Sequence, residues 1–267
     1  MIASLDMYDF PEVRDATDAW WAALARGFAA EGLEDIPRHR TRLPEESVPW
    51  SAPDLFFTQI CGYPLRKQFR RTLRVVGTPC YRAEGCSGPR YRSAIIVQRG
   101  AGIGSIAELR GARLAYNGAH SQSGMSAFRA LLAEKGVEPG FFGDAICSRG
   151  HRASVALVSS GEADTAAIDC VTLALLQKHA PQECDTIEIL AWTPDAPGLP
   201  YAVPAATSGA TVAAMRRGIE RALADPAAQS ARDALLICGF SPLSDADYEE
   251  IDVMETRARE QGLSSLF

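Results

Sequence analysis

A short run of small polar residues, Ser121-Gln122-Ser123-Gly124, has the composition of an anion-binding helix start. It follows an apolar strand pattern at residues 113–116 and precedes apolar residues at helical spacing. The first N–H groups of a helix have no partner within the helix, and the helix dipole adds partial positive charge there. Serine hydroxyls and a glycine that permits close approach would complete a socket for an oxyanion. The alternative is a serine that only caps the helix.

Strand and helix patterns alternate along the chain and predict two α/β clusters with a mostly parallel sheet. Strands are expected near residues 2–5, 54–59 and 73–77, then near 91–98, 113–116, 142–148, 164–169 and 187–192. The proline-rich residues 195–204 predict an extended return segment. After it, helices are expected at residues 210–224, 226–236 and 245–261, with Gly239 between the last two. The loop after residues 2–5 contains Tyr8, and such loops carry ligands in open α/β sheets.

The composition of the chain excludes some classes of binding partner. With 267 residues, of which 47% are hydrophobic and 22% charged, the chain suits a globular protein with one large domain or two smaller ones. The net charge of -6 argues against nucleic acid as a partner. No apolar run reaches transmembrane length, so we expect no membrane span. The first residues lack the pattern of a secretory signal, which predicts a cytoplasmic protein, or a periplasmic one if a signal precedes this sequence.

Seven cysteines are scattered through the chain, an odd number without any C-x-x-C pair. This pattern argues against a zinc site, and we expect neither a metal nor a cofactor. Free thiols are the default expectation. Cys80 and Cys86 flank a loop that contains Gly85 and could be bridged if oxidised.

The order of these motifs resembles the phosphonate-binding-protein-like family of periplasmic solute-binding proteins, a branch of the type 2 periplasmic-binding fold. Four stretches between residues 2 and 224 carry the resemblance: residues 91–111, 115–124, 150–169 and 197–201. In the second of them, Ser121 to Gly124 is similar to the family's Ser-Thr-Ser-Gly anion loop, with Gln122 in place of the threonine. The resemblance implies two α/β lobes with a ligand cleft between them. One lobe would contain residues 1–90 and 203–267, and the other residues 91–202 with the anion loop.

The resemblance also implies a set of ligand-binding residues. They are Tyr8, Tyr63, Asn117, Ser121, Gln122, Ser123, Gly124, Met125, His151, Asp169 and Tyr201. Within this set the serines, the helix-start N–H groups and His151 would hold the anion, and Asp169 would take an amine of the ligand. Structural alternatives exist for three of them, because His151 or Asp169 could cap a helix and Tyr63 could be a packed aromatic residue in a turn.

The implied function is that of a solute-binding protein for a small oxyanion, such as phosphate or a phosphonate, linked to ABC-type uptake with a permease as partner. Two alternatives stay open, a cytoplasmic ligand-sensing module and a cofactor-biosynthesis enzyme on the same fold. The enzyme would use His151 with Cys147 or Cys61 as a nucleophile pair. No local motif around either cysteine supports such a pair, so we expect no catalytic residues and a binding function.

Overall fold

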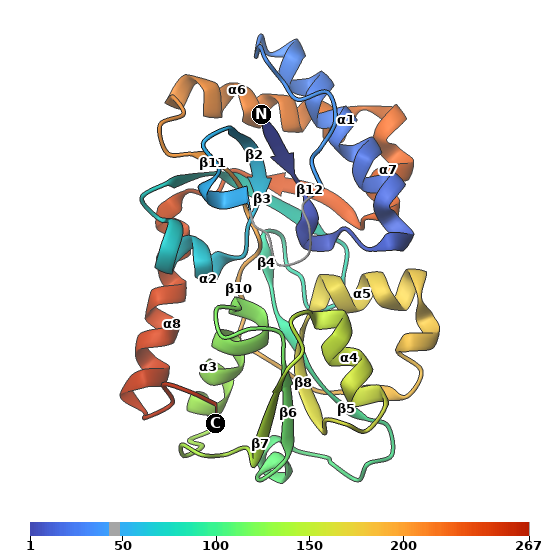
Figure 1. Ribbon diagram of the computed structural model, residues 1–267, viewed down its shortest axis with the longest axis vertical. Coiled ribbons are helices and arrows are strands. Elements are labelled where there is room, and N and C mark those ends of the chain that lie inside the picture. Colours follow the sequence, from blue (N-terminus) through green and yellow to red (C-terminus); the bar gives the residue numbers. More distant parts are fainter. Residues whose placement is uncertain (43–48, 267) are drawn as a thin grey trace. The chain divides into compact units, whose positions relative to one another are not determined.

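The computed structural model describes residues 1–42 and 49–266, and the chain forms two compact units. The first unit contains Met1–Arg82, Ser87–Pro89 and Pro197–Tyr248. The second contains Ala83–Cys86, Arg90–Ala196 and Glu249–Phe267. These bounds differ from the expected lobes mainly at the C-terminus, because Ala258, Leu263 and Leu266 are buried in a core of the second unit. The predicted α/β class is confirmed (Figure 1).

The sheet of the first unit has the strand order β1-β2-β11-β3-β12. Strand β1 (Ile2–Ser4) pairs in parallel with β2 (Leu55–Gln59). Strand β11 (Tyr201–Pro204) lies antiparallel between β2 and β3 (Leu73–Tyr81), and β12 (Ile237–Ser241) is antiparallel to β3. The expected mostly parallel sheet is therefore wrong for this unit. The proline-rich residues 195–204 predict an extended segment, but their sequence does not show that it pairs with β2 on one side and β3 on the other.

Helices α1 (Arg14–Ala30), α6 (Gly209–Ala224) and α7 (Gln229–Ala234) pack on the core of the first unit. Helices α1 and α6 approach closely at two glycines. A Cβ atom added at Gly27 would lie 2.1 Å from the backbone oxygen of Gly218. Between β2 and β3 the chain forms the short helix α2 (Gly62–Pro64) and a π-helical turn, Leu65–Phe69.

The sheet of the second unit has the order β7-β6-β8-β5-β9. Strand β6 (Arg113–Tyr116) is parallel to both β7 (Asp144–Cys147) and β8 (Thr165–Asp169). Strand β5 (Ser93–Gln98) is antiparallel to β8 and to β9 (Ile187–Trp192). Two further short strands, β4 (Arg90–Tyr91) and β10 (Ala196–Pro197), pair with each other.

Both faces of this second sheet are covered by helices. Along β5, Ile95 and Val97 belong to one core, whereas Ala94 and Ile96 belong to the other, as the two-residue period of a strand requires. Helices α3 (Ala127–Glu134) and α8 (Glu249–Glu260) contribute to the first of these cores, and α4 (His151–Ser159) and α5 (Cys170–His179) to the second. Among the described residues, no helix combines the length and the apolar content needed to cross a bilayer.

Candidate functional site

The predicted anion loop lies where the parallel strands β6 and β8 of the second unit end. Strand β6 ends at Tyr116, and after a short loop the chain forms a π-helical turn, Gln122–Ser126, that leads directly into α3. Ser121 is the N-cap of this turn, and its hydroxyl accepts a hydrogen bond of 3.0 Å from the backbone N–H of Gly124. The capping role of Ser121 is thus present in the structure.

Ser123, His151 and Asn117 meet at this helix start. The Ser123 hydroxyl lies 2.7 Å from Nε2 of His151, and Nδ2 of Asn117 lies 3.3 Å from the same nitrogen. The hydroxyls of Ser121 and Ser123 are 3.4 Å apart. His151 is the first residue of α4, so the starts of two helical segments meet at the contact between Ser123 and His151.

The histidine at the centre of this cluster is neutral at pH 7. Burial lowers the pKa of His151 from 6.5 to about 4. A neutral imidazole carries one N–H donor and one acceptor nitrogen. It can therefore form hydrogen bonds in the cluster without the cost of burying a charge.

Gly124 allows the loop to close onto Asn117. A Cβ atom at Gly124 would lie 1.9 Å from Oδ1 of Asn117 and 3.3 Å from the His151 ring. That amide oxygen is buried, and no hydrogen-bond partner for it occurs among the residues that the structure describes. A side chain at this position would therefore displace the Asn117 amide from the cluster.

Asp169 ends β8 and caps α5. Its Oδ1 accepts hydrogen bonds of 2.7 Å from the N–H of Val171 and 3.1 Å from that of Thr172, and the residue is 2% exposed. Strands β6 and β8 are parallel neighbours, so their carboxyl ends lie at one edge of the sheet. Asp169 therefore caps a helix in the structure, and it does so at the edge of the sheet that carries Ser121 and Ser123.

Two of the expected ligand residues in the loop point into the interior. Gln122 is fully buried, and its amide nitrogen lies 3.8 Å from the sulfur of Met254 on α8. Met125 is 5% exposed and belongs to a core cluster. Their side chains anchor the turn to the second unit, which leaves their backbone groups as the part available to a ligand.

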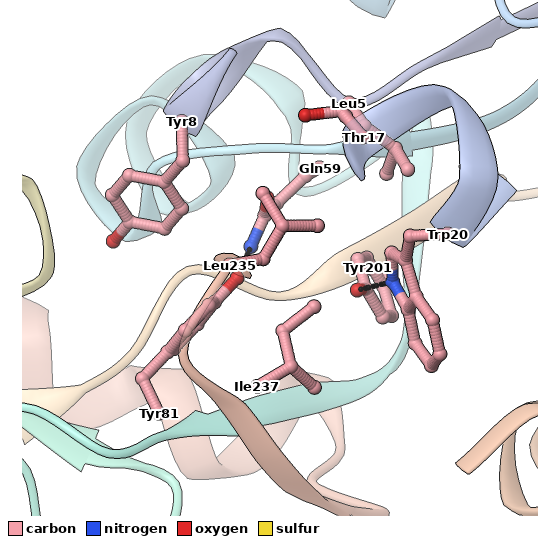
Figure 2. Close-up of a pocket in the computed structure, with 9 residues that line it drawn as sticks. All are labelled: Leu5, Tyr8, Thr17, Trp20, Gln59, Tyr81, Tyr201, Leu235 and Ile237. Atoms are coloured by element: carbon pink, nitrogen blue, oxygen red, sulfur yellow. Dashed lines mark hydrogen bonds between the residues drawn. The ribbon is translucent and has the colours of Figure 1, made fainter. Parts of the chain in front are cut away.

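The remaining expected residues, Tyr8, Tyr63 and Tyr201, lie in the first unit. Figure 2 shows a pocket there that contains two of them, lined by Leu5, Tyr8, Thr17, Trp20, Gln59, Tyr81, Tyr201, Leu235 and Ile237. Trp20 Nε1 donates a hydrogen bond of 2.9 Å to the Tyr201 hydroxyl, and Gln59 Nε2 donates one of 3.0 Å to the Tyr81 hydroxyl. Tyr63 is buried in α2 and does not line this pocket.

This first-unit pocket is small and aromatic. Its volume is about 20 Å³, enough for about one water molecule at roughly 10–15 Å³ each. The ring of Tyr8 packs edge-on against that of Tyr81, with centroids 5.2 Å apart. Gln59 and Tyr81 were not among the expected ligand residues, although Gln59 ends a buried strand, and strand ends are where polar side chains meet ligands.

A buried arginine fixes the loop that carries Tyr8. The Arg40 side chain is 1% exposed and forms ion pairs with Asp9 at 2.6 Å, Asp18 at 2.7 Å and Asp6 at 3.4 Å. Asp6 and Asp9 flank Tyr8 in the sequence, so this network holds both sides of the loop. Sequence reasoning missed Arg40 because its three partners gather only in the folded unit.

The described part of the chain contains no group of three or more His, Cys, Asp or Glu side chains arranged to hold a metal ion. No disulfide joins the described cysteines, and Cys80 is not linked to Cys86.

Comparisons with known proteins show the family and the fold of this chain. Residues 62–248 match a family described as ABC transporter, phosphonate, periplasmic substrate-binding protein. No curated protein matches the chain significantly.

Solved structures of similar fold include three with nearly full coverage. XAC2383 from Xanthomonas citri bound to chloride has 15% identity and a TM-score of 0.73, with 99% of each chain covered. PhnD1 from Prochlorococcus marinus in complex with methylphosphonate has 14% identity and a TM-score of 0.70, covering 97% of this chain and 98% of that one. A binding protein component of an ABC phosphonate transporter from Pseudomonas aeruginosa, PA3383, has 14% identity and a TM-score of 0.75, covering 98% and 88%. The fold is that of the type 2 periplasmic-binding proteins. The chain belongs to the family of periplasmic substrate-binding proteins of ABC phosphonate transporters.

Proposed function

We propose that this protein binds a small phosphorus oxyanion, phosphate or a phosphonate, at the cluster of Asn117, Ser121, Ser123, Gly124 and His151, and presents it to an ABC permease. The observation that carries the proposal is the contact of 2.7 Å between Ser123 and a neutral His151 at the meeting of two helix starts. Family membership supports a small ligand and a permease as partners.

The cluster offers the groups that an oxyanion needs. Two serine hydroxyls and the Asn117 amide can donate hydrogen bonds, and helix starts contribute N–H groups and partial positive charge. These effects act within the first turn of a helix, so the overall charge of -6 does not oppose them. Hydrogen bonds to a charged partner contribute about 1.5–3 kcal/mol each, enough for a few donors to give selective binding.

The same geometry disfavours catalysis. A hydroxyl 2.7 Å from an imidazole has the spacing of a nucleophile and its base. However, a base with a pKa of about 4 removes a proton poorly at neutral pH, so Ser123 is not activated. The Nε2 atom of His151 faces Ser123 and Asn117 rather than a thiol, which gives no support to the nucleophile pairs with Cys147 or Cys61.

The other expected ligand residues stay part of the proposal. Asp169 would approach an amine-bearing ligand from the end of β8, although its Oδ1 is already used as a helix cap. Tyr8 and Tyr201 would contribute from the aromatic pocket of the first unit, and Tyr63 from α2.

A thermal-shift screen tests the proposal. The chain is unfolded and refolded to remove any carried-over ligand, then measured with phosphate, methylphosphonate, aminoethylphosphonate, sulfate and small carboxylates. A ligand at a hundredfold excess over its Kd adds roughly 2.7 kcal/mol of stability, which raises Tm by about 5–10 °C in a protein of this size. We expect this rise with a phosphorus oxyanion.

Ser123→Ala should weaken that binding at least tenfold, since a hydrogen bond to a charged group is worth roughly 1.5–3 kcal/mol. Ser105→Ala is the matched control, because Ser105 is exposed in the same unit and its side chain makes no capping hydrogen bond. No Tm shift with any phosphorus oxyanion, or equal affinities for the two variants, would count against the proposed site.

A further inference from the structure

Two thiols of the second unit are in contact. The sulfur atoms of Cys86 and Cys170 lie 3.4 Å apart, and both residues are free cysteines. Cys86 ends the short segment Ala83–Cys86 and is half-buried. Cys170 is the first residue of α5, directly after Asp169, and is 1% exposed.

The backbone around both residues is held in place. The N–H of Cys86 donates to the Ala83 oxygen at 3.1 Å, and that of Cys170 donates to the Arg92 oxygen at 3.1 Å. Gly85, with a φ of +91°, packs directly over the start of α5, because an added Cβ would lie 3.0 Å from Cβ of Cys170 and 2.6 Å from the Trp192 ring. Tight backbone packing, rather than side-chain freedom alone, therefore brings the two thiols together.

We propose that Cys86 and Cys170 form a redox modification site that closes to a disulfide when the protein meets a disulfide oxidant. The bond requires the sulfurs to approach from 3.4 Å to about 2.05 Å. Rotation of the two side chains, whose sulfur atoms are already in contact, can supply a shift of this size. The two thiols are 84 residues apart in the sequence, so the bridge closes a long loop.

The chemistry is a two-step thiol–disulfide exchange with oxidised glutathione as the oxidant. The Cys86 thiolate attacks one glutathione sulfur, the glutathione S–S bond breaks, and one glutathione leaves as a thiolate. Cys170 then loses its proton and attacks the Cys86 sulfur, which expels the second glutathione thiolate. The two protein thiols are oxidised by two electrons, and the two released glutathione molecules take up the protons.

Exposure sets the order of these steps. Cys86 is the more accessible thiol, whereas the contact with Cys86 and burial both raise the pKa of Cys170 and keep it protonated. Cys86 therefore attacks first and Cys170 resolves the mixed disulfide. Proteins of this family are periplasmic, and the bacterial periplasm is an oxidising compartment in which such a bond persists.

The bridge has a defined structural effect. It joins the Ala83–Cys86 segment covalently to the start of α5, next to the capping carboxylate of Asp169. Closing a loop of this length restricts the unfolded chain, so the oxidised protein should melt higher by up to about 10 °C.

The test counts thiols in the full chain. The protein is incubated with oxidised or reduced glutathione, freed of it, denatured and labelled with a maleimide, and its linked peptides are mapped without reduction. We expect the oxidised wild type to yield one linked peptide pair containing Cys86 and Cys170 and to lose two thiols to that bridge, with any glutathione bound at the exposed Cys147 or Cys238 counted separately by its mass. The higher Tm should return to the reduced value on addition of dithiothreitol.

Cys86→Ser and Cys170→Ser should each prevent the loss of two thiols and the rise in Tm. Cys86 is only half-buried, so the first variant keeps the test valid if the second does not fold. Cys147→Ser, which removes an exposed thiol of the same unit, should still form the bridge. Seven reactive thiols after oxidation, a linked pair of other cysteines, or an unchanged loss of two thiols in Cys86→Ser would overturn the proposal. None of these outcomes depends on anion binding.

Discussion

Acidification should destabilise this protein through His151. The folded state lowers the pKa of His151 from 6.5 to about 4, because burial disfavours the charged imidazole. The unfolded chain therefore binds a proton as the pH falls through 6.5, whereas the folded chain binds it only near pH 4. The contribution of His151 to the free energy of unfolding is therefore fully present above pH 6.5 and is lost progressively between pH 6.5 and 4. Below pH 4 this group causes no further loss.

The size of the loss follows from the two pKa values. They differ by 2.5 units, and each unit corresponds to 1.36 kcal/mol, which gives about 3 kcal/mol. The residue is half-buried overall, so this figure is an upper limit. Even so, it is a substantial part of the roughly 5–15 kcal/mol by which most proteins are stable.

Urea unfolding at pH steps from 7 to 4, in buffers without phosphate, measures the effect. The wild type is compared with His151→Gln, which cannot titrate, and the carboxylates common to both proteins cancel in the difference. His120→Gln is the control, because it removes an exposed histidine of the same unit and leaves the cluster intact.

We expect the stability advantage of the wild type over His151→Gln to shrink by up to about 3 kcal/mol between pH 6.5 and 4. The difference between the wild type and His120→Gln should not follow this curve. A constant difference for His151→Gln across the range, or one that grows as the pH falls, would refute the argument that burial keeps this imidazole neutral.

Two further substitutions test the packing that positions the candidate site. Gly124→Ala would place a methyl carbon 1.9 Å from Oδ1 of Asn117. We expect this variant to lose roughly 1–3 kcal/mol of stability and to bind methylphosphonate at least tenfold more weakly by calorimetry. Gly118→Ala is the control and should change neither quantity, because a Cβ atom there has no described neighbour within 4 Å. Arg40→Met removes the guanidinium that lies 2.6 Å from the buried Asp9 carboxylate, which keeps only a longer contact of 3.4 Å with Arg42. We expect a cost of up to about 3–5 kcal/mol in urea unfolding, against less than about 1 kcal/mol for Arg26→Met in an exposed pair. Equal losses of stability for Gly124→Ala and Gly118→Ala, or for Arg40→Met and Arg26→Met, would contradict the packing described for that residue.

The sequence predicted the local features of the cluster well. A serine before an apolar helical pattern is a typical N-cap, and Ser121 is the cap. Asp169 at a strand end before a helix follows the same logic and accepts two N–H groups. Such features depend on a few neighbouring residues, so their physical cause can be read from the chain itself.

Features set by distant residues could not be predicted in this way. Strand β12 was not predicted, and Ile237–Ser241 was expected to lie between two helices. The segment is short and gains its strand geometry only by pairing with β3. Helix α8 was expected as a helix, but not as part of the second unit, since nothing local shows which core Ala258 enters. The contact between Ser123 and His151 likewise joins residues 28 positions apart.

The return of α8 to the second unit has a consequence for how the protein is made. One core of that unit begins with Ile95 and includes Leu263 and Leu266. The segment Pro197–Tyr248 of the first unit is synthesised before these two leucines. Domains usually fold as units during synthesis, N-terminal parts first. Here the unit that carries the serine cluster completes this core only after Ala258, Leu263 and Leu266 have been synthesised. While Pro197–Tyr248 is synthesised, the second unit therefore leaves part of this core uncovered, a state that favours engagement by chaperones.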